Sequence, residues 1–173
     1  MIDRLFLLLV NRWSRLVLLA LVFGALQTTL FAEIRPFGVV VQFAFLFAAL
    51  AGSLHGAEVG AMAGFVVGFL YDTALTSPFG VTAAVAAIVG LTGGLLPFLV
   101  RDPTWWSVSI VVATATAVGV CATPVFLALV GTPSGVGGAV VGFAAVAAGV
   151  NAVLSVPMIP VLRWTLRDAG LGE

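Results

Sequence analysis

The sequence predicts an all-α membrane protein folded as a compact bundle of six transmembrane helices. The first observation behind this fold class is composition, since 62% of the 173 residues are apolar and only 8% are charged. A soluble domain carries roughly 25% charged residues because water must wet its surface. The other two observations are six long apolar runs and an uneven distribution of arginines along the chain. We therefore expect most of the outer surface to face lipid.

The six apolar runs are the predicted spans, because about 20 apolar residues cross roughly 30 Å of hydrocarbon. They are Leu16–Phe31, Phe37–Leu54, Ala57–Thr73, Phe79–Val100, Ser107–Val130 and Gly138–Leu162. The basic start of the chain resembles a signal peptide, but no convincing small-residue cleavage site follows the first run, which we interpret as a retained helix. The segments between the runs are short, so residues 1–173 are interpreted as one polytopic membrane domain.

The arginines predict the orientation, because short cytoplasmic loops carry an excess of positive charge. With six spans and a cytoplasmic N-terminus, Arg35 alone falls outside. The six arginines on the inside are Arg4, Arg12, Arg15, Arg101, Arg163 and Arg167. The chain has no lysine and is rich in alanine, valine and glycine, a composition typical of a GC-rich bacterial genome. We expect a bacterial cytoplasmic membrane protein with both termini in the cytoplasm and tryptophans anchored at that interface.

The third run, GAEVGAMAGFVVGFLYD, has a glycine at every fourth position: Gly56, Gly60, Gly64 and Gly68. Small residues at this spacing let another helix approach closely, which matters in lipid because no hydrophobic force drives helices together there. Each four-residue step turns about 40° around the helix, so the glycines form a slanted stripe. The sequence predicts a helix-packing face, either within this chain or toward another protein.

Asp72 continues the same spacing and lies roughly 22 Å along the third helix, near its outer end. A carboxylate at that depth must be solvated, paired or neutralised. Two interpretations stay open: a functional contact, with Arg35 as a possible ion-pair partner, or a cap that bonds backbone amides of the next loop. Asn151 is the other intramembrane polar residue of interest, since its amide lies in the middle of the sixth run.

The stretch GAMAGFVVGFLYDTALTSPFGVTA resembles the MreD family, the small polytopic subunit of the bacterial rod-shape machinery. The residues that carry the resemblance are Gly60, Gly64, Phe65, Gly68, Asp72 and Gly80. Near the C-terminus, Asn151, Pro157 and Pro160 resemble the last helix of the family. One departure is Phe37, which follows Pro36 where family members often have an aspartate.

The resemblance implies a non-catalytic subunit that pairs with MreC, a bitopic protein. Together they would connect the MreB cytoskeleton with the RodA glycosyltransferase and its class B penicillin-binding partner in peptidoglycan synthesis. It also implies a bundle similar to the S-components of energy-coupling-factor vitamin transporters.

A small-molecule carrier of the S-component type is the alternative function, with Asp72 or Asn151 touching the solute. The short outer loops, which are nearly free of polar recognition groups, argue against it. An enzyme is the least expected class, because His55 and Glu58 lack further metal ligands and no serine has a matching base. We predict no catalytic, cofactor or metal site.

Overall fold

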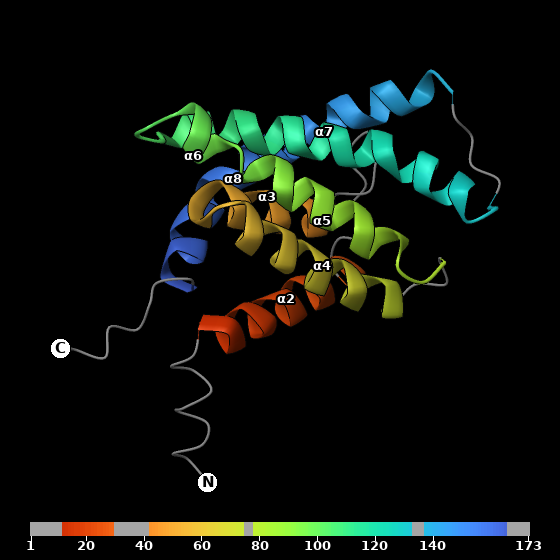
Figure 1. Cartoon of the computed structure of the whole chain (residues 1–173), viewed down its shortest axis with the longest axis horizontal. Helices are drawn as coiled ribbons and strands as arrows, with labels where there is room; N and C mark the ends of the chain where they lie inside the picture. The colour runs from red at the N-terminus through yellow and green to blue at the C-terminus, as the bar shows by residue number, and fades with distance from the viewer. Residues whose placement is uncertain (1–11, 30–41, 75–77, 133–136, 166–173) are drawn as a thin grey trace, which may run out of the picture.

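The computed structural model describes residues 12–29, 42–74, 78–132 and 137–165, and most of these residues are in helices (Figure 1). The helices are α2 (Arg12–Thr29), α3 (Phe43–His55), α4 (Ala57–Ala74), α5 (Val81–Gly93), α6 (Leu96–Leu99), α7 (Trp105–Leu129) and α8 (Ala139–Thr165). Within the described residues, three segments are long and apolar enough to cross a membrane: Val81–Leu99, Trp105–Leu129 and Ala139–Trp164. The protein is thus an all-α membrane protein with several transmembrane helices.

Each predicted span overlaps a helix, and two of them differ from the prediction in an informative way. The second helix begins only at Phe43, because Gln42 is the non-helical N-cap of α3, and residues 37–41 lie outside the described part. The fourth span is broken into α5 and α6 by a turn at Gly94 and Leu95. Hydropathy does not predict either boundary, because the residues at both breaks lie within apolar sequence.

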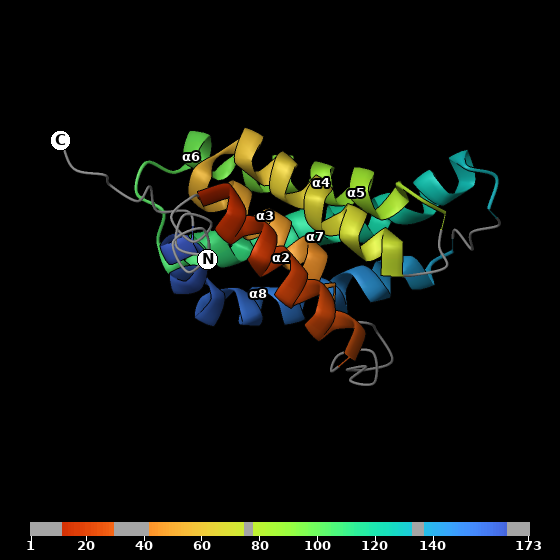
Figure 2. The same cartoon turned by 90° about the horizontal axis from the view of Figure 1, so that it is seen from below.

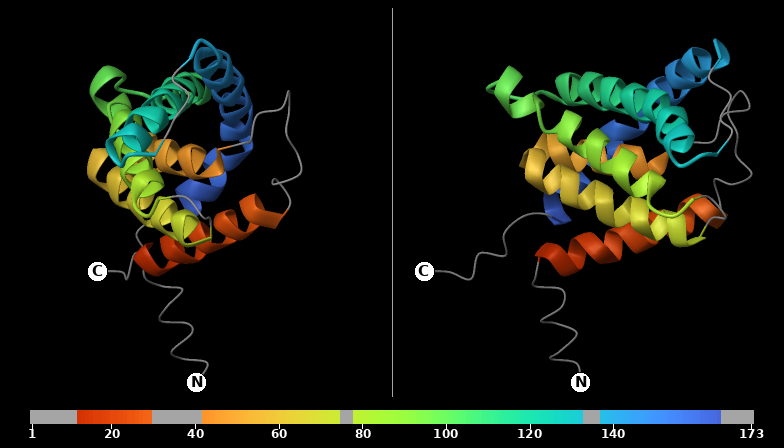
Figure 3. Two further views of the ribbon diagram at one scale, coloured as in Figure 1. Left: turned by 90° about the vertical axis from the view of Figure 1, so that its right-hand side faces the viewer. Right: turned by 45° about the vertical axis from the view of Figure 1, so that its right-hand side comes forward.

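Helix α3 lies at the centre of the bundle. All eleven residues from Phe43 to Ser53 are buried, and Figure 3 (left) shows α3 with other helices around it. It packs against α4, α5, α7 and α8, and more lightly against α2. A helix that is apolar on every side is stable where every side is covered. Its 13 residues span about 20 Å, less than the hydrocarbon thickness, and the longer neighbours enclose it.

The two ends of the bundle differ in charge. All four arginines of the described segments lie at the end formed by the start of α2, the α6–α7 turn and the end of α8: Arg12, Arg15, Arg101 and Arg163. The exposed Trp105, Trp106 and Trp164 lie there as well. The opposite end carries the α4–α5 turn, the end of α7 and the start of α8 (Figures 1 and 2). This is the distribution that the positive-inside rule requires if the arginine-rich end is cytoplasmic.

Arg15 connects the first and last described helices at the arginine-rich end. Its Nη1 donates a hydrogen bond to the carbonyl oxygen of Trp164 at 3.3 Å. The guanidinium carbon lies 5.9 Å from the centroid of the Trp164 ring. A cation near the last carbonyls of α8 complements the negative end of that helix. The described chain therefore starts and finishes on the same side of the bundle.

Candidate functional site

Helices α4 and α5 are in backbone contact along the glycine stripe of α4. A Cβ on Gly60 would overlap the carbonyl oxygen of Gly90, and one on Gly64 would overlap that of Ala86. A Cβ on Gly68 would lie 2.6 Å from the Cα of Ala83. These distances leave no room for a side chain, and the atoms in the way belong to the backbone. The structure thus places the three glycines in an interface within this chain.

The partner surfaces are also built from glycine, which was not predicted from the sequence. Gly90, Gly93 and Gly94 lie against the backbones of Gly60, Ala49 and Ala57, respectively. Gly52 of α3 meets Gly90 and Gly94. The partner surface could have been predicted from the glycines at positions 90, 93 and 94, because small residues in an apolar run are typical of close helix contacts in membranes.

The outward face of α4 is aromatic. Phe65 and Phe69 have ring centroids 6.2 Å apart, and Phe79 meets Phe69 edge to face at 5.2 Å. All three side chains are exposed. Helix α4 therefore turns its glycines toward α3 and α5 and its bulky rings away from the bundle.

Gly56 does not belong to the packing face, and its prediction as a packing residue is wrong. It lies in the turn between α3 and α4 with φ of +94°, and a Cβ there would meet nothing within 4 Å. A positive φ is readily adopted only by glycine. Gly56 is therefore required by the backbone conformation of the turn, although its spacing matches the stripe.

Asp72 caps helix α5 from the end of α4. Its side chain is buried, and Oδ2 accepts hydrogen bonds from the backbone N–H groups of Gly80 at 2.9 Å and Ala83 at 3.2 Å. Gly80 is the N-cap of α5 with φ of +92° and has no side chain to cap the helix itself. A carboxylate at this position satisfies free amides and complements the positive end of the helix.

This geometry corresponds to the capping interpretation of Asp72. Its second oxygen, Oδ1, is buried and has no hydrogen-bond partner among the described residues. The possible ion pair with Arg35 lies outside the described residues, since residues 30–41 are not among them. That pairing stays a prediction.

Asn151 joins three helices in the bundle interior. It is fully buried, and Nδ2 donates to the backbone oxygen of Gln42 at 3.1 Å and to Oγ1 of Thr116 at 3.1 Å. The bond to a carbonyl oxygen fixes the amide orientation, because a carbonyl can only accept. Oδ1 therefore points away from Gln42 and has no partner within the described segments.

A second polar contact joins α7 and α8 nearer the arginine-rich end. The hydroxyl oxygens of Ser109 and Ser155 lie 2.8 Å apart. Hydrogen bonds of this kind hold transmembrane helices together, each contributing roughly 0.6–2 kcal/mol. This pair was not predicted from the sequence, because single serines in apolar runs do not indicate their partners.

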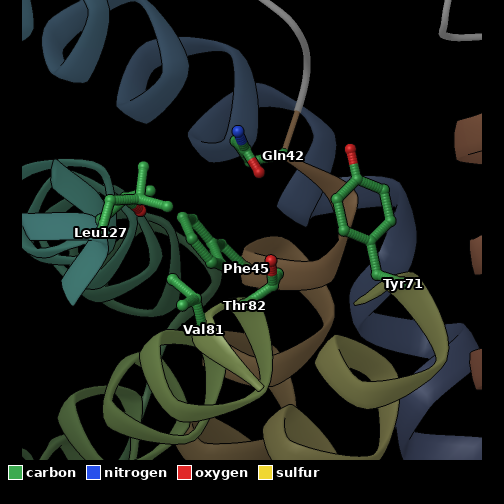
Figure 4. A pocket seen from close by; sticks show the side chains of 7 residues that line it. Gln42, Phe45, Tyr71, Val81, Thr82 and Leu127 are labelled. Carbon is green, nitrogen blue, oxygen red and sulfur yellow. The ribbon is translucent and has the colours of Figure 1, made fainter. Parts of the chain in front are cut away.

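A cavity of about 200 Å³ lies at the end of the bundle opposite the arginines (Figure 4). It is formed by the start of α3, the end of α4, the start of α5 and the last turns of α7. Figure 4 shows the polar tips of Gln42, Tyr71 and Thr82 around it, with Phe45 and Leu127 as apolar walls. Neither Asp72 nor Asn151 lines this cavity.

Metal-binding chemistry finds no support in the described part of the chain. Among those residues, no group of three or more His, Cys, Asp or Glu side chains could hold a metal ion. Glu58 is exposed at the first turn of α4.

Compared with protein-family models, with curated proteins and with solved structures, the chain gives no match.

Proposed function

We propose that this chain is a non-catalytic membrane subunit of the bacterial cell-elongation complex, pairing with an MreC-like bitopic protein. In this role it helps to organise the RodA glycosyltransferase and its penicillin-binding partner. The observation that carries the proposal is the glycine and aspartate pattern that resembles the MreD family. Gly60, Gly64, Gly68, Asp72 and Gly80 all have a structural task in joining α4 to α5.

This use of the pattern favours a scaffold over a solute carrier. Backbone contact between α4 and α5 and the cap at Asp72 fix the two helices relative to each other. A subunit that organises other proteins needs a rigid core and an exposed surface that binds a partner. The glycine and aspartate pattern of α4 and α5 supplies the rigid core.

Helix α8 has an exposed surface that could bind a partner helix. Four small residues, Gly138 just before the helix and Gly142, Ala145 and Gly149 within it, recur at intervals of four, three and four and are all exposed. A Cβ on Gly142 or Gly149 would meet nothing within 4 Å. Exposed small residues at this spacing suit the close approach of a transmembrane helix. The single transmembrane helix of a bitopic partner is the occupant that the proposed role requires.

Co-purification with the MreC-like protein of the same organism tests the proposal. We expect the wild-type chain to retain that partner in mild detergent, and Gly142→Leu to lose most of it while remaining folded. Cys121→Leu on the exposed surface of α7 is the matched control, and it should retain the partner. If the wild-type chain retains no MreC-like protein, the proposed role is wrong. If Gly142→Leu retains it fully, the role stands and the assignment of the α8 surface is wrong.

A further inference from the structure

Two prolines interrupt the hydrogen bonding of α8 in its half nearer the arginine-rich end. Pro157 and Pro160 lie inside the helix, which stays α-helical on both sides of them. Proline has no N–H, so the carbonyl oxygens four residues earlier, those of Val153 and Val156, lose the donors that a regular helix provides. Each proline therefore leaves one backbone acceptor without its helical partner.

Both acceptors lie on the outward side of α8. Val153 is 72% exposed and Val156 is 42% exposed. A helical carbonyl points along the axis toward the residue four positions later, and here those residues, Pro157 and Pro160, are also exposed. Counted from Arg163, the two carbonyls lie roughly 10 and 15 Å along the helix axis. They are thus within the hydrocarbon, where neither water nor an acyl chain can donate a hydrogen bond.

No side chain of the described segments replaces the missing donors. The hydroxyl nearest in sequence is that of Ser155, which is fully buried. It donates to the carbonyl oxygen of Ala152 at 2.6 Å and lies 2.8 Å from the hydroxyl of Ser109, so it serves the contact with α7. Transmembrane helices tolerate prolines where a neighbouring group satisfies the freed carbonyls. A donor from outside these segments would do so here.

The spacing of the two carbonyls suits one kind of donor. Positions 153 and 156 are three residues apart, so their carbonyl oxygens are about 5 Å apart in a regular helix. A primary amide has two N–H donors on one nitrogen, and two hydrogen bonds of about 2.9 Å that diverge from it end about 5 Å apart. The amide of Asn or Gln can thus bond to both carbonyls, whereas a hydroxyl can bond to only one. An uncharged amide also enters hydrocarbon at a lower cost than a charged side chain.

We propose that the carbonyls of Val153 and Val156 accept hydrogen bonds from the side-chain amide of an Asn or Gln in the transmembrane helix of the bitopic partner, an assignment that rests on the proposed function above. The exposed Gly142, Ala145 and Gly149 continue the same face of α8 at intervals of three and four residues. They let the partner backbone come close. The amide fixes the register of the two helices, because only one position of the partner helix brings it to both carbonyls.

Pro157→Ala and Pro160→Ala together restore both N–H donors, so α8 can bond to its own carbonyls again. We expect this double variant to bind the MreC-like protein about tenfold more weakly than the wild type in mild detergent, a loss of 1.4 kcal/mol. The variant should fold, because alanine is the stronger helix former. Pro124→Ala is the matched control, since it also removes a proline from the interior of a helix. It should bind the partner like the wild type.

The amide can also be removed from the partner. Replacing the Asn or Gln of the partner helix by Leu should weaken binding about tenfold, with no further loss when it is combined with the double proline variant. This cycle separates loss of the hydrogen bonds from a change in the shape of α8, because a change of shape alone would make the two losses add.

The carbonyl of Val156 provides a direct measurement. Val156 and Pro157 form the only Val-Pro pair in the sequence, so carbonyl-¹³C valine with ¹⁵N proline isolates this one carbonyl in filtered NMR spectra. We expect its ¹³C signal to move downfield when the wild-type partner binds. If the wild-type chain retains no MreC-like protein, the proposed function is wrong and this contact with it. If the partner is retained, the contact alone is wrong when the Val156 signal does not move, when the double proline variant binds undiminished, or when the partner helix has no Asn or Gln.

Discussion

Gly60 of α4 and Gly90 of α5 face each other so closely that a Cβ on either would overlap the carbonyl oxygen of the other. Gly64 with Ala86 and Gly68 with Ala83 continue the same contact along the two helices. The contact is made by backbone atoms, which cannot rotate away as a side chain can. The stability of this contact therefore depends on side-chain size at four glycine positions, 60, 64, 68 and 90.

We predict that Gly64→Leu destabilises the protein by about 3 kcal/mol or more, because overpacking against backbone cannot be relieved by a change of rotamer. Thermal unfolding in detergent measures the effect. Gly142→Leu introduces the same side chain on α8, where a Cβ meets nothing within 4 Å. This variant should leave the midpoint temperature of unfolding nearly unchanged. Equal midpoints for the two variants would contradict the close contact.

For Asp72, we expect Asp72→Ala to cost about 0.5–2 kcal/mol, the usual range for a lost helix cap. Asp72→Asn should cost less, because an amide oxygen can still accept from Gly80 and Ala83. Hydrogen exchange at the amides of Gly80 and Ala83 provides a local measurement, and both should exchange faster in Asp72→Ala. The exposed Asp102 is the control, since Asp102→Ala should not alter these two amides. Unchanged protection in Asp72→Ala would rule out the cap.

Asn151 and Thr116 should be energetically coupled. A double-mutant cycle with Asn151→Leu and Thr116→Val should give a coupling of about 0.6 kcal/mol, with 1.7 kcal/mol as an upper bound for such pairs in membranes. The same cycle with Thr114→Val in place of Thr116→Val should give no coupling, because the Thr114 hydroxyl bonds to the carbonyl oxygen of Val111 on its own helix. Equal values in the two cycles would show that the Asn151–Thr116 bond contributes nothing specific.

The predicted orientation can be tested by labelling cysteines from one side of the membrane. In a Cys121→Ser background, Thr104→Cys precedes α7 at the arginine-rich end, and Thr132→Cys follows it at the other end. A membrane-impermeant maleimide added to intact spheroplasts should label position 132 and not position 104. Permeabilised cells serve as the control, because both positions should then react. The reverse pattern would invert the topology.

The helical membrane organisation could be predicted from sequence because long apolar runs and arginine placement each reflect one strong physical requirement. The glycines at 60, 64 and 68 were also predictable, since a small residue at every fourth position of an apolar helix is what close backbone packing requires. Gly56 has the same spacing and a different task. Spacing alone therefore does not distinguish a packing glycine from one that a turn requires.

The partners of the polar residues could not be predicted in the same way. Asn151 bonds to Gln42, which is 109 positions away along the chain, and no local pattern encodes such a pairing. The cavity likewise takes its lining from four helix ends that only the fold brings together. For Asp72 the sequence left two interpretations, and the bonds to Gly80 and Ala83 correspond to the cap.

The burial of α3 has a consequence for how the chain is made. Its phenylalanines at 43, 45 and 47 are covered mainly by α4, α5, α7 and α8, all of which are synthesised later. During translation this segment must therefore enter the bilayer exposed to lipid acyl chains and leave them only when the C-terminal helices arrive. A chain truncated before α7 would leave in lipid the sides of α3 that α7 and α8 cover, and it should be degraded by membrane quality-control proteases.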